Sequence, residues 1–105
     1  MKEAEIVKKA VQELKLQGIC AVWVAHKKKF YPDSDVFGIF DIVYYEKHGN
    51  QTHTGFIQVT TLSNLSHRRK KIISFFAAQN LAVPARVFVW AYDRNRSRFV
   101  KENIL

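Results

Sequence analysis

The first segment of the chain carries apolar residues at the spacing of an amphipathic helix. One stripe of residues 3–17 is formed by Ile6, Val7, Ala10, Val11 and Leu14. Gly18 follows this stripe, and glycine is common just past the last turn of a helix. A second helical pattern begins near Ser66, a residue type that caps helix starts, and stops at Asn80. Helices are therefore predicted over residues 3–17 and 66–79.

The other apolar runs have the β-branched and aromatic composition of strands. They cover residues 20–25, 37–46, 56–61 and 85–92, and a further short edge strand is expected over 98–105. The first two runs are apolar at both parities, which is typical of strands that are covered on both faces. This pattern predicts that Cys20 and Trp23 are buried in the core.

The order of these elements predicts the fold class. The order is helix, strand, strand, strand, helix, strand, and the short turn around residues 48–51 favours an antiparallel arrangement of the first strands. The helical connection allows a parallel crossover into the strand that begins at Ala85. We expect a single α/β domain over residues 1–105, with a mixed central sheet and helices on both faces. The Gln58 strand should lie between the Asp41 strand and the Ala85 strand.

Charge narrows the choice of partner. The chain has 105 residues, with 17 Lys and Arg against 9 Asp and Glu, a net charge of +8 and a pI near 9.8. Such an excess of positive charge favours a polyanion, most commonly nucleic acid, although a solvated basic surface is the simpler alternative. The sequence has one cysteine and neither a signal-peptide pattern nor a long apolar span. A cytoplasmic protein without membrane contact is the expectation.

Three polar features carry the candidate chemistry. Asp41 interrupts the apolar run 37–46, and Gln58 interrupts the run 56–61. A carboxylate in a buried strand is costly unless a metal, a cation or hydrogen bonds meet it. The second predicted helix then carries the basic cluster His67, Arg68, Arg69, Lys70 and Lys71. An acid, an amide and a basic helix together indicate a site for a phosphodiester.

With these residues in this order, the chain resembles the PD-(D/E)xK nuclease superfamily, the restriction-endonuclease-like fold that includes archaeal Holliday-junction resolvases. The superfamily core is α-β-β-β-α-β, and the resemblance covers nearly the whole chain. Phe40-Asp41 falls at the "PD" pair, and Gln58-Val59-Thr60 falls at the (D/E)xK motif. The resemblance implies DNA binding, cleavage that depends on Mg²⁺ or Mn²⁺, and possible function as a homodimer.

The resemblance also implies roles for particular residues. Asp41 and Gln58 would be the catalytic pair and, with an acid of the first helix, the metal ligands. Glu5 is the first candidate for that helical acid and Glu13 the second. Two departures affect activity, because Gln58 replaces the motif acid and Thr60 replaces the motif lysine. The protein is thus expected to be either a weak Mg²⁺-dependent endonuclease or a catalytically degenerate relative.

Several alternatives stay open at the level of sequence. Asp41 can instead be bound by a backbone amide or paired with an arginine such as Arg86. The basic helix, together with Lys27, Lys28 and Lys29, can contact phosphates or can form a solvated surface. The competing functions are a non-enzymatic RNA-binding module and a subunit that binds another protein through exposed aromatic residues.

Overall fold

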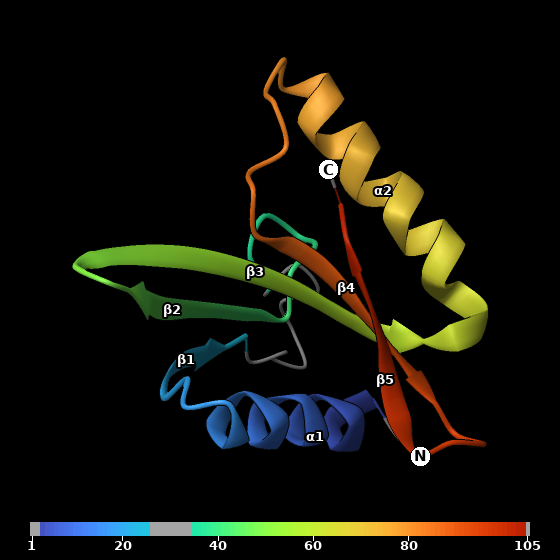
Figure 1. The fold of residues 1–105 in the computed structure, drawn as a ribbon. Helices are drawn as coiled ribbons and strands as arrows, with labels where there is room; N and C mark the ends of the chain where they lie inside the picture. The colour runs from blue at the N-terminus through green and yellow to red at the C-terminus, as the bar shows by residue number, and fades with distance from the viewer. Residues whose placement is uncertain (1–2, 26–34, 105) are drawn as a thin grey trace.

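A five-stranded mixed sheet with a helix on each side forms the fold of this protein (Figure 1). The computed structural model describes residues 3–25 and 35–104. Its elements are α1 (Glu3–Leu16), β1 (Ala21–Val24), β2 (Ile42–His48), β3 (Gln51–Thr61), a 3-10 turn (Leu62–Asn64), α2 (Leu65–Ala78), β4 (Val87–Asp93) and β5 (Arg98–Asn103). The predicted element order and fold class are confirmed. No helix in the described ranges is long and apolar enough to span a membrane.

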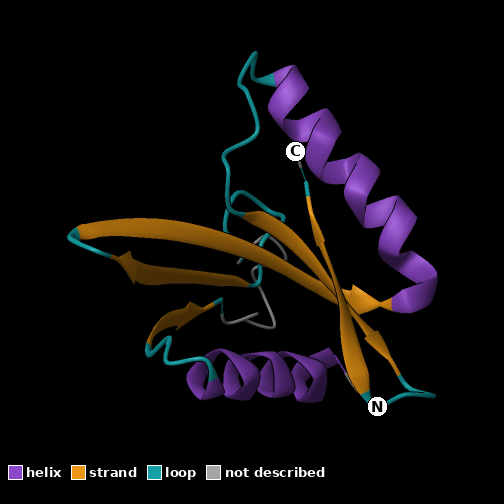
Figure 2. Cartoon of the chain, in the orientation of Figure 1, coloured by secondary structure: helices purple, strands orange, loops and turns teal. Residues whose placement is uncertain are grey.

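The strands follow one another across the sheet in the order β1-β2-β3-β4-β5. The pairing of β3 with β4 is parallel, and all the other pairings are antiparallel. The parallel pair is possible because α2 carries the chain back between β3 and β4 (Figure 2). The expectation that the Gln58 strand lies beside both the Asp41 strand and the Ala85 strand is confirmed.

Each helix buries an apolar stripe against its own face of the sheet (Figure 1). The helix residues buried on the α1 side are Ile6, Ala10 and Leu14. Those buried on the α2 side are Ile72 and Phe76. On the sheet, Ile57 belongs to the α1 cluster, whereas Val89 belongs to the α2 cluster. The two clusters identify the face to which each strand residue points.

The predicted strand 37–46 begins only at Ile42. Phe37 and Gly38 have φ values of 55° and 69°, in the left-handed region, which an extended strand does not contain. An isolated bridge between Val36 and Phe40 closes this turn. Asp41 therefore lies directly before β2 and not in the middle of a strand, as the apolar run had indicated.

The prediction that the first strand is buried on both faces was wrong. β1 is an edge strand of four residues in which exposed and partly buried positions alternate. Cys20 is exposed, and the Trp23 side chain is 52% exposed. Trp23 and Cys20 are exposed because α2 packs against β3 and β4 and does not extend across the sheet to β1. One side of β1 is thus left without a covering element in the described structure.

A glycine is required opposite Tyr44, where β3 pairs with β2. Gly55 lies opposite Tyr44, and a Cβ added at Gly55 would sit 2.0 Å from the Tyr44 ring carbon Cζ. The ring therefore lies across the backbone of β3 and is 5% exposed. Burial and the nearby charge of Glu46 raise the pKa of the Tyr44 hydroxyl above its usual value near 10.

Candidate functional site

The Asp41 side chain continues the hydrogen bonding between β2 and β3 beyond the last paired residues of the two strands. The last paired residues there are Ile42 and Ile57. Beyond them, the backbone N–H of Val59 donates a hydrogen bond of 2.8 Å to Asp41 Oδ2. The Asp41 side chain is 5% exposed, and this bond offsets part of the cost of its burial. The alternative of a backbone-bonded Asp41 is confirmed, whereas Arg86 lies beside a different carboxylate.

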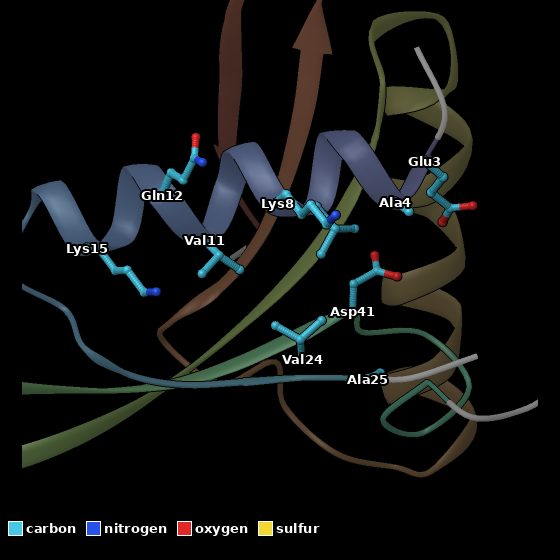
Figure 3. Close-up of a pocket in the computed structure, with 10 residues that line it drawn as sticks. Glu3, Ala4, Lys8, Val11, Gln12, Lys15, Val24, Ala25 and Asp41 are labelled. Atoms are coloured by element: carbon cyan, nitrogen blue, oxygen red, sulfur yellow. The ribbon is translucent and has the colours of Figure 1, made fainter. Parts of the chain in front are cut away.

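Gln58 lies on the opposite face of the sheet from the Asp41 carboxylate. The register places Gln58 beside Val89, in the α2 cluster, and Val59 beside Trp90, in the α1 cluster. Because side chains alternate along a strand, Gln58 faces α2. Figure 3 shows the Asp41 carboxylate pointing toward α1. The structure therefore does not bring the expected pair of motif side chains together.

The β3 side chains that point to the same face as the Asp41 carboxylate are those of Val59 and Thr61. The side chains of Gln58 and Thr60 point to the opposite face. Neither Val59 nor Thr61 supplies a carboxylate or a cation. Gln58 is 4% exposed, and its Oε1 has no hydrogen-bond partner within the described part of the chain. Among the described residues, no three His, Cys, Asp or Glu side chains gather closely enough to hold a metal ion. Within residues 3–25 and 35–104, the donors that the motif requires are therefore not gathered on one face.

A pocket of about 610 Å³ lies between α1 and β1 and includes Asp41 (Figure 3). Its apolar wall is formed by Val7, Val11 and Val24. Its charged groups, besides Asp41, are Glu3, Lys8 and Lys15 of α1. The pocket therefore combines two carboxylates with two ammonium groups at the border of an apolar wall.

The acid of α1 that shares this pocket is Glu3. Glu5 is exposed and does not line the pocket, and Glu13 forms an ion pair with Lys101. Glu5 does not share this pocket because a helix turns by about 200° in two residues, which carries Glu5 away from the Glu3 face. The spacing of Glu3 with Val7, four residues later, is the sequence signal that identifies this face.

The basic cluster of α2 divides into two groups. Arg69 forms a bidentate ion pair with Glu102 of β5, with 2.7 Å between Nη2 and Oε2. These hydrogen bonds raise the pKa of the Arg69 guanidinium above its ordinary value, so this arginine has a structural partner. The exposed members are His67, Lys70 and Lys71, and none of them forms an ion pair in the described ranges.

Arg68 is placed differently from its neighbours. It lines a small pocket of about 120 Å³ together with Glu3, Thr61 and Asn64. Its Nε is buried and has no hydrogen-bond partner among the described atoms. Glu3 therefore borders both pockets, and the start of α2 lies close to the start of α1. The expected contact residues Lys27, Lys28 and Lys29 lie outside the described residues.

Comparison with known proteins gives a distant structural likeness. No protein-family model matches the sequence, and no curated protein matches it. The structure is similar to that of D212, a nuclease from a fusellovirus, with a TM-score of 0.46 and 13% sequence identity. The similarity covers 96% of this chain and 62% of D212, so the chain spans less than two thirds of that protein.

Proposed function

We propose that this protein is a DNA-binding member of the restriction-endonuclease-like fold. The observation that carries the proposal is the basic surface of α2, defined here as His67, Lys70 and Lys71. These side chains are exposed and lack carboxylate partners in the described chain. Cations without partners can neutralise phosphates, and the released counterions then favour binding. The net charge of +8 adds long-range attraction to a polyanion.

Binding without efficient cleavage is the activity that the Asp41 pocket favours. A Mg²⁺ ion in a phosphodiesterase is commonly held by one or two carboxylates, waters and substrate phosphates. Asp41 and Glu3 would be the two carboxylates here, but Val59 and Thr61 stand at the strand positions beside Asp41. Slow metal-dependent hydrolysis is the second candidate, favoured only by the shared pocket of Glu3 and Asp41.

The binding experiment removes the basic surface of α2 and measures the salt dependence of affinity. In the triple variant His67→Ala/Lys70→Ala/Lys71→Ala, affinity for duplex DNA should fall for all sequences alike. The slope of log affinity against log salt should decrease by roughly 0.9 for each lost phosphate contact. Arg69 is left intact because its loss would break the ion pair with Glu102.

The matched control is Lys9→Ala/Lys15→Ala on α1. It removes as many lysine charges as the α2 variant, two, but from the opposite side of the sheet. This control should lose less affinity and keep most of the slope. An equal loss in both variants would show only a general effect of net charge and would contradict the assigned surface. Tighter binding to RNA of the same sequence would favour the RNA-binding alternative.

The cleavage experiment uses branched and linear DNA with Mn²⁺ and with EDTA. The second candidate requires slow cleavage that disappears in EDTA and in Asp41→Asn. The variant that would restore the motif on the correct face is Val59→Glu/Thr61→Lys, whereas Gln58→Glu/Thr60→Lys changes the α2 face and serves as its control. Cleavage that persists in EDTA would refute a metal site at Asp41.

A further inference from the structure

One side of β1 and β2 presents a sheet face that neither helix covers in the described structure. α2 packs against β3 and β4, and the cluster beneath it includes no residue of β1 or β2 among those described. Trp23 of β1 is 52% exposed, and Tyr45 of β2 is 56% exposed. Two large aromatic side chains at these exposures are unusual, because aromatic residues ordinarily supply core burial.

The strand register places these two side chains together. Trp23 pairs with Val43, and Tyr45 pairs with Ala21, so the two aromatic residues are diagonal neighbours on adjacent antiparallel strands. Diagonal neighbours are roughly 7–8 Å apart and lie on the same face of the sheet. Val43 in turn pairs with Phe56, which packs against the α2 cluster. The aromatic pair therefore lies on the α2 side of the sheet.

Beyond the aromatic pair, toward the turn between β2 and β3, this face is polar and carries one lysine. Lys47 lies two residues beyond Tyr45, on the same face, and is exposed. Its partner across the strands is Thr52, and the partner of Tyr45 is Thr54, both of them exposed. Obligate protein interfaces are more apolar and deplete lysine at their centre. A lysine and two hydroxyls beside two rings match an anionic, aromatic ligand better than a second apolar surface.

We propose that this face, termed the stacking platform and defined as Trp23, Tyr45 and Lys47, binds unpaired bases of single-stranded nucleic acid. The inference rests on the proposed nucleic-acid binding and names the form of the nucleic acid. Bases stack on exposed aromatic rings irrespective of sequence, and a cation beside the rings holds the adjacent phosphate. Two rings on adjacent strands provide a surface for successive bases.

A third exposed aromatic residue on this side of the sheet packs against α2. Phe37 is 63% exposed, and its ring stacks on Phe75 of α2 with centroids 5.7 Å apart. It also contacts Phe56, at 6.4 Å between centroids. Lys71 lies one helical turn before Phe75. Phe37 therefore adds a further exposed ring on the α2 side of the sheet.

The test compares a labelled oligo-dT with a duplex of the same length by fluorescence anisotropy. Trp23→Ala and Tyr45→Ala should each weaken oligo-dT binding roughly 10-fold and leave duplex binding within about 2-fold of wild type. Trp23→Phe should recover most of the affinity because phenylalanine keeps a stacking face. Far-UV circular dichroism of each variant verifies that the fold is retained.

An oligonucleotide with abasic sites separates stacking from phosphate contact. Wild type should bind it more weakly than Trp23→Ala binds oligo-dT, because stacking on both rings is lost, and Trp23→Ala should cause no further loss. An unchanged affinity of a folded Trp23→Ala for oligo-dT would overturn the stacking platform while leaving duplex binding by α2 intact.

A shift of Trp23→Ala from dimer to monomer in sedimentation, without loss of oligo-dT binding, would assign the face to a second copy. Failure of wild type to bind either form at low salt would refute the proposed function itself.

Discussion

The two faces of the sheet carry helices of the same length, 14 residues each, yet within the described residues only the α1 side has a cluster that draws on every strand. The cluster under α1 receives side chains from all five strands, including Val22, Tyr44 and Phe99. The cluster under α2 receives strand residues from β3 and β4 and is completed by Phe40 and Ile104. The difference shows that the reach of a helix, and not the apolarity of a strand, decides which strand residues become core.

The two tryptophans make this difference concrete. Trp90 and Trp23 both stand in apolar runs that predict strands. Trp90 lies in the fourth strand of the sheet on the α1 side and is 4% exposed, whereas Trp23 lies on the open side and is 52% exposed. The first is part of the core, and the second is the exposed ring on which the proposed stacking platform rests.

The largest expected effect separates these two residues. Trp90→Ala should lower the free energy of unfolding by about 3–5 kcal/mol, because it removes a buried ring and leaves a cavity. Trp23→Ala should lower it by less than about 1 kcal/mol. Urea unfolding followed by circular dichroism measures both values. Losses of similar size would mean that the side of β1 bearing Trp23 is covered.

The next largest effect is expected in the free energy of unfolding when Asp41, the buried polar residue on the α1 face, is compared with Gln58, the one on the α2 face. Asp41→Ala removes the acceptor of the Val59 N–H and should cost about 1–3 kcal/mol of unfolding free energy. Asp41→Asn keeps an oxygen in place and should cost less. Gln58→Met, on the α2 face, should change stability by less than about 1 kcal/mol because Gln58 Oε1 has no partner among the described atoms. A larger loss at Gln58 than at Asp41 would reverse this comparison.

The smallest expected effect is a dependence of stability on alkaline pH through Tyr44. Burial raises the pKa of this hydroxyl in the folded state, so the unfolded chain releases the proton first as the pH passes about 10. Stability should therefore fall as the pH rises from 10 toward the folded pKa, and Tyr44→Phe should flatten that fall. Unfolding in urea at several alkaline pH values measures the slope. An equal flattening by Tyr45→Phe, on the open face, would contradict the assignment to Tyr44.

Local patterns in the sequence determined most of the fold. The apolar stripe of residues 3–17 and the β-branched runs predict helix and strand because side-chain spacing follows backbone geometry. The short turn around residues 48–51 and the helical crossover also predict which strands pair and in which direction. The prominence of Asp41, Gln58 and the basic α2 helix was likewise visible in the sequence.

Only the tertiary structure decided which side of the sheet each polar group faces. The left-handed turn at Phe37 and Gly38 shifts Asp41 out of the strand, and its carboxylate points to α1 while Gln58 faces α2. In a strand, a shift of one residue moves each side chain to the other face of the sheet. A small change in where a strand starts can therefore put two motif residues on opposite faces, although they look paired in the sequence. The exposure of Trp23 depends in turn on how far α2 extends across the sheet, a property of packing between distant segments.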